Sequence, residues 1–386
     1  NWMHHFFSSK EIPNCKSATN YLNKLNSNSY KEGHHNFLYS FITFNIILKA
    51  FLKWSLFLFK IQIIENRVTK NILMLKYGWL WPVIKKDWES SFYGSVCMDN
   101  IIIFYLLEEF IRTLPKQRTG LYLCENQGWE RAFIYLWKKY GHEKLYGVAH
   151  SSIRYWDLRY FDDLCIWNNK GSYSQPQPDF IALNGPTSLK EFQQADQPDD
   201  SIIKVEALRY THLQSLKKKY HNEDKINFHG SILVLGEYVP ENNHNILKMI
   251  NGLDRSILSM YKILLKFHPG NEKINYKLYP NINLNVSTKP LSNILTKSDI
   301  VIGSGNSTAT MESFLIGIKT IMVLEKNNFN FSPLRNQSGI NFVYTNDQLQ
   351  SAIINNSKKR LNHDLNHYFF IDKNLNRWKK ALKLNL

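Results

Sequence analysis

The sequence predicts an α/β protein of two domains, each built on an open sheet of parallel strands. Short apolar runs alternate with amphipathic segments along most of the 386 residues, which is the pattern of strands joined by crossover helices. Polar residues follow the apolar runs, at the strand ends where open α/β sheets bind ligands. The length suits two domains that each bury a core of their own.

The N-terminal 70 residues carry no recognisable chemical motif. Residues 1–40 are polar, rich in Asn and Ser, and are expected to form a loosely packed leader. Phe41–Ile64 is the most apolar run of the chain, yet three lysines within it argue against a membrane-spanning helix. The run is interpreted either as an amphipathic helix lying in a membrane surface or as a buried domain helix with lysines at its edge. The three lysines are Lys49, Lys53 and Lys60.

Residues 71–210 are predicted to form the first domain. Residues 71–88 begin like a strand and reach a Gly-Trp-Leu-Trp-Pro turn, and residues 100–114 have the pattern of a helix. The predicted strands that follow are Gly120–Cys124, Leu145–Ala149, Asp179–Leu183 and Ile202–Val205, with a helix at Arg131–Lys139.

Residues 211–228 are polar and charged, and they are interpreted as the linker to a second domain at residues 229–362. That domain begins with the apolar strand Ser231–Leu235, and Tyr261–Phe267 is predicted to be a further strand. Residues 363–386 are predicted to be helical, basic and amphipathic.

The most informative stretch is Ser298–Leu324, which has the pattern of strand, loop, helix and strand. Its parts are the strand Ile300–Ile302, the loop Gly303–Asn306, a helix that Ser307 or Thr308 caps and Gly317 ends, and the strand Thr320–Leu324. The loop offers backbone N–H groups, hydroxyls and a helix N-terminus at one point, which suits an anion such as phosphate. The alternative is an ordinary strand-to-helix turn with a good cap.

Ser307-Thr308-Ala309, followed by Glu312 and Gly317, resembles the donor-binding motif of GT-B glycosyltransferases. The resemblance implies that the two hydroxyls bind the donor phosphate and that Glu312 binds the ribose. It also implies the GT-B fold, in which two Rossmann-like domains have a cleft between them. In GT-B enzymes a C-terminal helix often crosses back onto the first domain, which is the role expected for residues 363–386.

His268-Pro269-Gly270 stands at the end of a predicted strand. It is similar to the His-Pro motif of bacterial sialyltransferases and capsule-type glycosyltransferases, in which the histidine meets the nucleotide phosphate. The expected donor site comprises Gly236, Glu237, His268, Pro269, Ser304, Gly305, Asn306, Ser307, Thr308 and Glu312.

The chain from about Trp79 to about Tyr344 resembles a bacterial surface-carbohydrate biosynthesis family of the O-antigen and capsule type. The motifs that carry this resemblance are Glu125–Glu130, His150-Ser151, Arg154 with Trp156–Phe161, and Glu206–Tyr210. The resemblance implies a glycosyltransferase without indicating one particular sugar.

Glu125 is the first candidate for the catalytic base, because a carboxylate at a strand end can take a proton from an attacking hydroxyl. Asn126 and Gln127 would orient this carboxylate or bind sugar hydroxyls. Glu125 could equally cap the following helix. His150 is the second candidate for the base, with a satisfied histidine at a strand end as the alternative.

Three arginines are candidates for binding an acceptor carboxylate or a phosphate by bidentate pairing. They are Arg154, Arg159 and Arg209. The alternative for each is an ion pair with a neighbouring carboxylate, namely Asp157, Asp162, Asp163 or Glu206.

No metal or cofactor is expected. The sequence has no Asp-x-Asp motif, Walker loop or His-Glu-x-x-His motif. The leaving phosphate would be neutralised by helix N–H groups, hydroxyls and His268 instead. The four cysteines lack metal-site spacing and no signal peptide is evident, so the expected location is the cytoplasm.

The formal net charge of +16 suits an anionic partner, but no zinc-finger spacing, aromatic RNA-binding strand or basic tail indicates nucleic acid. A nucleotide sugar, and peripheral contact with an anionic membrane at the cytoplasmic face of the inner membrane, account for the charge. The expected function is transfer of a CMP-activated acidic sugar, sialic-acid-like or Kdo-like, to a glycan or lipid-linked acceptor in surface polysaccharide biosynthesis. The alternatives are a UDP- or GDP-sugar transferase, a nucleotide-sugar epimerase, and a non-catalytic scaffold of a polysaccharide assembly complex.

Overall fold

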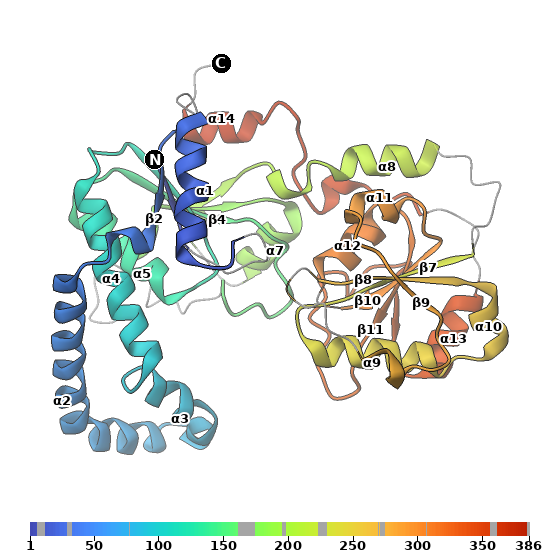
Figure 1. The fold of residues 1–386 in the computed structure, drawn as a ribbon, viewed down its shortest axis with the longest axis horizontal. Coiled ribbons are helices and arrows are strands. Elements are labelled where there is room, and N and C mark those ends of the chain that lie inside the picture. The colour runs from blue at the N-terminus through green and yellow to red at the C-terminus, as the bar shows by residue number, and fades with distance from the viewer. Residues whose placement is uncertain are drawn as a thin grey trace. The chain divides into compact units, whose positions relative to one another are not determined.

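The computed structural model describes residues 1–5, 12–28, 33–76, 78–160, 174–194, 198–222, 230–268, 270, 275–305, 307–355 and 361–383. The described chain forms two compact units (Figure 1). Unit 1 is the described part of Asn1–Tyr146 and Cys165–Asp179, and unit 2 is the described part of Gly147–Leu164 and Phe180–Leu386.

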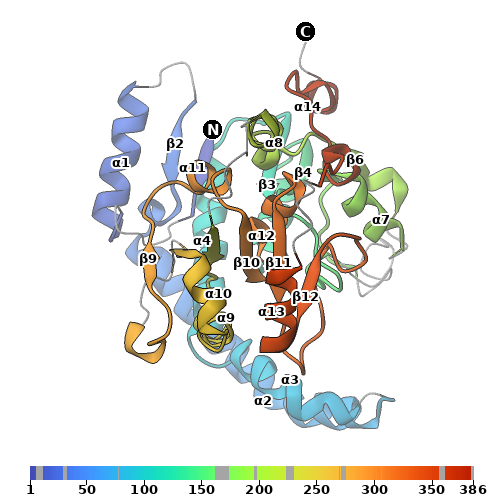
Figure 2. The ribbon, with the colours of Figure 1, turned by 90° about the vertical axis from the view of Figure 1, so that its right-hand side faces the viewer.

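Unit 1 begins with a small parallel strand pair and a helix. These elements are β1 (Trp2–His4), α1 (Cys15–Asn28) and β2 (His35–Phe37). α1 lies beside β2 (Figure 2), where Ala18 and Leu22 pack against Phe37. Residues four apart share one face of a helix, so Ala18 and Leu22 both face the small core that they form with Phe37. The described part of residues 1–40 thus differs from the loosely packed leader that its polar composition suggests.

Three helices follow in unit 1, namely α2 (Phe44–Met74), α3 (Trp81–Ser90) and α4 (Ser95–Thr113), with the short 3-10 turns η1 (Leu38–Phe41) and η2 (Gly78–Leu80). α2 and α4 run side by side (Figure 1), and Ala50 of α2 packs against Cys97 and Ile101 of α4. The Thr43 hydroxyl caps α2 by accepting the N–H of Ile46. None of the described helices is both long and apolar enough to cross a membrane.

Residues 71–88 do not begin as a strand, and that expectation is wrong. α2 continues to Met74, and the Gly-Trp-Leu-Trp-Pro segment forms η2 and the start of α3. Pro82 lies in the first turn of α3, where the lack of a backbone N–H costs nothing. The proline therefore begins a helix here instead of marking the turn after a strand.

The first sheet has the order β3-β4-β5-β6. Its strands are β3 (Thr119–Leu123), β4 (Lys144–Ala149), β5 (Phe180–Leu183) and β6 (Ile202–Lys204), with α5 (Gly128–Lys139), α7 (Pro186–Gln194) and the turn η3 (Asp199–Ser201) between them. β5 and β6 are parallel. The boundary between the units falls within β4, between Tyr146 and Gly147.

The second sheet lies wholly in unit 2 and has six strands in the order β12-β11-β10-β7-β8-β9, with every neighbouring pair parallel. The strands are β7 (Ser231–Leu235), β8 (Lys262–Lys266), β9 (Leu284–Val286), β10 (Ile300–Ser304), β11 (Lys319–Val323) and β12 (Asn341–Val343). Their alternating residues face two cores: Ile232 and Val234 belong to one, and Leu233 and Leu235 to the other.

Helices cover both faces of this sheet (Figure 1). One face carries α9 (Pro240–Asn251), α10 (Arg255–Met260) and α13 (Asn346–Ile354), and the other carries α8 (Leu213–Asn222), α11 (Leu291–Leu295) and α12 (Thr308–Leu315). The remaining elements are η4 (Leu208–Tyr210), η5 (Tyr276–Leu278), η6 (Leu365–His367) and α14 (Asn376–Leu382). The predicted α/β class with two parallel-stranded sheets is confirmed.

Two segments bear on the predicted domain organisation. The described part of residues 211–228 forms α8, whose Leu213 and Tyr220 are buried in the core of unit 2. Residues 363–386 hold η6 and the short α14, and Leu375 adopts a left-handed backbone before α14. Trp378 of α14 packs against Ala182 and Val205, beside β5 and β6. The predicted domain boundaries stay a prediction.

Candidate functional site

The carboxyl ends of four strands meet at one edge of the second sheet, because neighbouring strands run parallel. Gly236 follows β7, Ser304 ends β10, and Glu325 stands just after β11. His268 stands just after β8. Most of the residues expected in the donor site thus come from one edge of one unit.

Ser304 and Glu237 are in direct contact. The Ser304 hydroxyl donates a hydrogen bond to one carboxylate oxygen of Glu237, and Asn242 Nδ2 donates to the other at 2.6 Å. Asn243 holds the Glu237 backbone, since its Oδ1 accepts the Glu237 N–H at 2.6 Å and its Nδ2 donates to the Glu237 carbonyl at 2.9 Å. Glu237 is only 8 % exposed, so this network satisfies a buried carboxylate and fixes the Ser304 hydroxyl.

α12 begins next to this network. Ser307 is its N-cap residue, and the Ser307 side chain makes no capping hydrogen bond. The side-chain cap that the sequence allows is therefore not formed, which leaves the hydroxyl for another acceptor or donor. Ser307 and Thr308 are both half-buried. Pro269 and Asn306, also expected in this site, lie outside the described residues.

Gly303 lets α12 approach β10 closely. A Cβ atom at this position would lie 2.2 Å from Oγ1 of Thr310 in the first turn of α12. Only glycine fits such a contact. The glycine therefore brings the start of α12 against the end of β10, which is the geometry that the anion-site prediction needs.

Glu312 pairs with a residue that sequence analysis missed. Its Oε2 lies 3.3 Å from Nε2 of His212, and the other ring nitrogen of His212 lies 3.0 Å from the Arg209 carbonyl. The hydrogen bond to the Glu312 carboxylate raises the pKa of His212 above its usual value, although burial acts in the opposite direction. His212 and Glu312 are 100 positions apart, so no local pattern could have indicated the pair.

His268 is exposed and keeps a local structure of its own. Its Nδ1 accepts the Gly270 N–H at 3.1 Å, and its ring meets the ring of Tyr238 edge-on at 5.7 Å. The contact to Gly270 fixes the imidazole against its own turn. The phosphate role of His268 stays a prediction.

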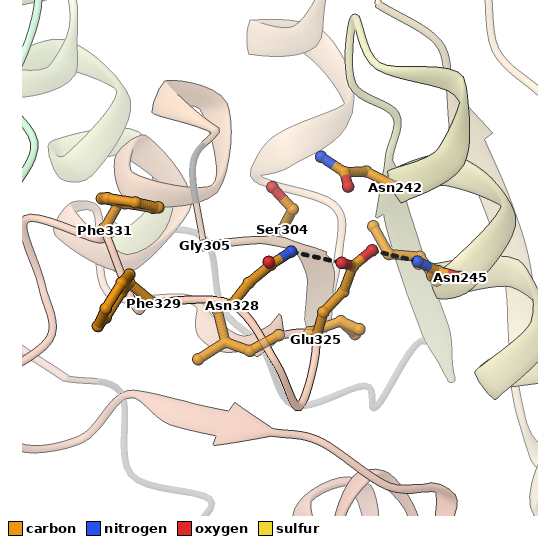
Figure 3. Close-up of a pocket in the computed structure, with 11 residues that line it drawn as sticks. Asn242, Asn245, Ser304, Gly305, Glu325, Asn328, Phe329 and Phe331 are labelled. Atoms are coloured by element: carbon orange, nitrogen blue, oxygen red, sulfur yellow. Dashed lines mark hydrogen bonds between the residues drawn. The ribbon is translucent and has the colours of Figure 1, made fainter. Parts of the chain in front are cut away.

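A cavity of about 190 Å³ opens beside Ser304 and Gly305 (Figure 3). Asn242 and Asn245 of α9 lie on one side, and Phe329 and Phe331 lie on the other. The remaining lining residues are Ile246, Val323, Leu324, Glu325 and Asn328. Sequence analysis named only Ser304 and Gly305 among all of these. Glu325 could have been found, because it is the first polar residue after the predicted strand Thr320–Leu324.

The arginines near residue 157 are engaged in ion pairs. Arg159 binds the Asp157 carboxylate in a bidentate manner, with Nε–Oδ1 and Nη2–Oδ2 distances of 2.7 Å, and Arg154 Nε lies 3.5 Å from Oδ2. Burial alone would raise the pKa of Asp157, but the two guanidinium groups lower it overall. The ion-pair alternative is thus present for Arg154 and Arg159, and their role toward an acceptor stays a prediction.

The same loop is tied to the segment that follows β11. The Tyr155 N–H donates to the Phe331 carbonyl at 3.1 Å, and the ring of Trp156 lies 5.9 Å from that of Phe329. The guanidinium of Arg335 lies 3.4 Å from the centre of the Tyr155 ring. These contacts carry the loop to the aromatic side of the cavity, and all of them lie within unit 2.

Glu206 has a structural role. Its carboxylate accepts the backbone N–H groups of Arg377 at 2.8 Å and Trp378 at 3.0 Å, which are in the first turn of α14. Glu206 therefore stabilises the start of a helix and binds Arg377, and its ion pair is not with one of the candidate arginines. Arg209 is exposed and lies over the ring of Tyr210 at 6.0 Å.

Glu125, Asn126 and Gln127 belong to unit 1. The N-cap of α5 is Gln127, and the buried Glu130 completes a capping box by accepting the N–H groups of Glu125 and Gln127 at 2.8 and 2.9 Å. Burial raises the pKa of Glu130, although these N–H groups act to lower it. The capping role that sequence analysis offered for Glu125 is thus filled by Gln127 and Glu130.

The catalytic roles of Glu125 and His150 stay predictions. Glu125 and His150 are both half-buried, and they belong to different units. No group of three or more potential metal ligands occurs within the described ranges of the chain. The expected independence of a metal stays a prediction as well.

No protein-family model matches the sequence, and no curated protein matches it. Solved structures with partial similarity include the UDP-GlcNAc 2-epimerase from Methanocaldococcus jannaschii, which is 11 % identical with a TM-score of 0.46 over 76 % of this chain and 84 % of that one. MurG from Acinetobacter baumannii is 9 % identical, with a TM-score of 0.39 over 66 % and 69 %. WaaG, a glycosyltransferase involved in lipopolysaccharide biosynthesis, is 8 % identical, with a TM-score of 0.36 over 66 % and 87 %. Likenesses at this level do not assign the chain to a family.

Proposed function

We propose that the protein is a GT-B-type glycosyltransferase, which transfers a sugar from a nucleotide donor to a glycan or lipid-linked acceptor in surface polysaccharide biosynthesis. One observation carries the proposal. β10 ends at Ser304, and Ser304 and the following Gly305 lie beside both the start of α12 and a cavity at the carboxyl edge of a parallel sheet. A helix start next to a small pocket suits a ligand in which a phosphate is joined to a sugar.

The donor phosphate would bind at the start of α12. Ser307 and Thr308 supply hydroxyls, the first turn supplies N–H groups, and the uncapped helix end supplies a partial positive charge. His268 would contact the same phosphate from the turn after β8. Glu312, one turn further along α12, would accept the ribose hydroxyls next to its partner His212.

The acceptor hydroxyl would be deprotonated by Glu125, with Asn126 and Gln127 binding sugar hydroxyls and His150 as the second candidate base. Arg209 is the arginine best suited to bind an acceptor anion, since it is exposed. Arg154 and Arg159 are paired with Asp157, so either would have to bind the acceptor anion alongside that carboxylate.

The nucleotide is the least specified part of the donor. The His-Pro motif favours a CMP-activated acidic sugar, whereas Glu312 suits the ribose of a UDP or GDP sugar equally well. A nucleotide-sugar epimerase on the same scaffold is the main alternative, and it would turn over its substrate without an acceptor. A non-catalytic scaffold would bind no nucleotide sugar, so binding and acceptor dependence together separate the three functions.

A thermal-shift screen with CMP, UDP, GDP and their sugars tests the proposal. A nucleotide at 100 times its dissociation constant stabilises the folded state by about 2.7 kcal/mol, which is a readily measured rise in unfolding temperature. A rise with one nucleotide class and its sugars is the expected result. The absence of a rise with every nucleotide and nucleotide sugar would contradict the proposal.

Peripheral membrane contact is also proposed, and α2 supports it. Eight large apolar side chains of this helix are exposed at spacings of three or four residues and so share one face: Phe44, Ile47, Leu48, Phe51, Leu52, Leu56, Phe59 and Ile63. Phe44 is 80 % exposed and Phe59 is 65 % exposed. Ile46, Ala50 and Ile61 are the buried residues of α2, so the helix has an apolar face besides the one it packs.

The charge around this face suits an anionic bilayer. Residues 44–90 contain eight basic and three acidic side chains. Trp79, Val83 and Ile84, at and beside the start of α3, add exposed apolar surface, and Lys85 and Lys86 follow directly. Apolar side chains at the acyl boundary and lysines near anionic headgroups are the two terms that together give stable peripheral binding. The proposed location is therefore the cytoplasmic face of the inner membrane.

A further inference from the structure

We propose that the cavity beside Ser304 binds the uncharged, hydroxyl-rich ring of the donor sugar and discriminates against acidic sugars. The inference rests on the proposed function, because it assumes that a nucleotide sugar occupies the edge of the second sheet. It concerns residues that the sequence did not indicate, above all Glu325, Asn245 and Asn328.

Hydrogen bonding at the cavity suits hydroxyl groups. The Glu325 carboxylate accepts hydrogen bonds from Nδ2 of Asn245 on one side and Nδ2 of Asn328 on the other (Figure 3). A carboxylate has about four acceptor sites, so two amide donors leave capacity for sugar hydroxyls. Each amide also presents an oxygen, and a hydroxyl can both donate and accept. Glu325 is thus held in place by neighbours that can themselves bind the same ring.

The charge of the cavity disfavours an anion. None of the described residues that line it is Lys, Arg or His, and Glu325 contributes a carboxylate. A second carboxylate, Glu237, stands directly behind the Ser304 hydroxyl and is buried. A ligand carboxylate placed here would meet two carboxyl groups and no cationic side chain in a partly desolvated setting, which makes its binding less favourable. The cavity therefore does not suit the carboxylate of a sialic-acid-like or Kdo-like donor.

The opposite side of the cavity is aromatic. Phe329 is 72 % exposed and Phe331 lies next to it, with ring centres 6.1 Å apart. Trp156, itself 57 % exposed, lies 5.9 Å from Phe329 and extends this surface. Ring faces carry partial negative charge, so the C–H groups of a sugar ring pack well against them. A polar side and an aromatic side together match the two kinds of surface that a neutral sugar ring presents.

Size and position indicate the sugar in preference to the rest of the donor. The cavity measures about 190 Å³, which is below the roughly 300–1,000 Å³ of sites for drug-sized ligands. It has room for one ring and not for a whole nucleotide sugar. Gly305 lines it, and Ser307 at the start of α12 is two residues away, at most about 7 Å along the chain. In a nucleotide sugar the ring is joined directly to the phosphate, so such a short reach fits.

Calorimetric titration with matched ligands tests the inference. The probes are UDP, UDP-glucose and UDP-glucuronic acid, with GDP, GDP-mannose and GDP-mannuronic acid as the second set if the protein binds guanine nucleotides. UDP-glucose is expected to bind at least tenfold more tightly than UDP, and at least tenfold more tightly than UDP-glucuronic acid. The two sugars differ only by a carboxylate, so this ratio isolates the charge of the cavity.

Three variants locate the effect. Glu325→Gln and Asn328→Ala are each expected to remove most of the affinity that UDP-glucose gains over UDP, while changing the affinity for UDP itself less than twofold. Glu325→Gln should also reduce the difference in affinity between UDP-glucose and UDP-glucuronic acid. Asn328 is exposed, so its substitution leaves the fold intact even if Glu325→Gln does not. Asn327→Ala is the matched control, because this exposed neighbour does not line the cavity.

Two results would overturn the inference and leave the proposed function standing. One is equal or tighter binding of the acidic sugar, and the other is an equal loss of UDP and UDP-glucose affinity in the variants, which would place the nucleotide base in the cavity. If no nucleotide of either set, nor CMP, binds the wild-type protein, the proposed function itself fails and the inference fails with it.

Discussion

Three buried carboxylates hold segments of unit 2 in place. Glu237 fixes Ser304, Asp157 gathers two arginines, and Glu206 caps α14. Each is buried and each has its charge satisfied by specific donors, which is the condition under which a buried carboxylate is tolerated. The sequence predicts that Glu237 contacts the donor. In the structure its carboxylate accepts the hydroxyl of Ser304, which is itself one of the residues expected to contact the donor.

The His212–Glu312 pair makes a pH-dependent prediction. The native pKa of His212 is raised by Glu312, so the pair contributes stability that is fully present below the unfolded pKa of about 6.5 and is lost as pH rises through the native pKa. Glu312→Gln is expected to lower the pKa of His212 toward 6.5. An NMR titration of the His212 ring protons, assigned with a His212→Asn variant, measures this. An unchanged pKa would mean that the carboxylate is not the cause of the shift.

Glu125 is tested by separating binding from turnover. Glu125→Gln should keep donor affinity and lower turnover by about 10²–10⁴-fold, the range for a lost general base. Because Gln127 and Glu130 form the helix cap, the variant is expected to keep its fold. Steady-state kinetics measure the turnover, and titration with the donor measures its affinity. Turnover near the wild-type value would exclude Glu125 as the base and make His150 the next residue to test.

Sequence reasoning found site residues where a local rule applies. Gly236, Ser304 and Ser307 follow apolar strands, and the rule that ligands bind at strand ends was enough to select them. The same rule would have selected Glu325. His212 was beyond reach, because its partner is 100 positions away and only the packing of α8 near α12 brings them together.

At the level of elements, the segment from β10 to β11 could be predicted closely. An apolar run, a glycine loop, a cap residue and a glycine with positive φ after the helix all agree there, with Gly317 at φ 97°. The length of α2 could not be predicted from the sequence. Its apolar pattern stops near Ile64, but the helix continues through polar residues to Met74 since nothing before Gly78 interrupts it.

The exposed face of α2 makes a membrane-binding prediction. Phe51→Asp with Phe59→Asp is expected to abolish sedimentation with vesicles that contain anionic lipid, because a charge replaces each apolar contact. Wild-type binding should weaken with added salt and be weaker still on vesicles of neutral lipid. Leu278→Asp is the matched control, since Leu278 is similarly exposed in unit 2.

Deleting residues 41–64 is a poorer test than these substitutions. The deletion also removes Ala50, which packs against Cys97 and Ile101 of α4. Loss of binding after such a deletion could come from unfolding. Equal vesicle binding by wild type and the Phe51, Phe59 double variant would contradict the membrane proposal.

The cap of α14 makes a stability prediction. Glu206→Ala leaves the N–H groups of Arg377 and Trp378 without their acceptor, which should lower the free energy of unfolding by about 1–3 kcal/mol. Urea unfolding followed by tryptophan fluorescence measures the change. Glu241→Ala, at an exposed site in the first turn of α9, should cost less than about 1 kcal/mol. Equal effects of the two substitutions would rule out a structural role for Glu206.

At the scale of the whole molecule, the α/β class could be predicted from the periodicity of apolar residues. The division of the chain into its two compact units could not. The loop after β4 belongs with unit 2, because contacts such as Tyr155 N–H to the Phe331 carbonyl join segments far apart in the sequence. Such contacts leave no local pattern. The helix within the predicted linker was missed for a related reason, since the charged residues of α8 hide the pattern of the buried Leu213 and Tyr220.

The central claim is that a nucleotide sugar binds at the start of α12. The most direct measurement is calorimetric titration of the best nucleotide from the screen into wild type, His268→Ala and the double variant Ser307→Ala, Thr308→Ala. Each hydrogen bond to the phosphate should contribute about 1.5–3 kcal/mol, so affinity is predicted to fall by at least tenfold in both variants. Thr345→Ala, which removes a real helix cap at α13, should lower stability without changing affinity. Unchanged affinity in both site variants would contradict the account.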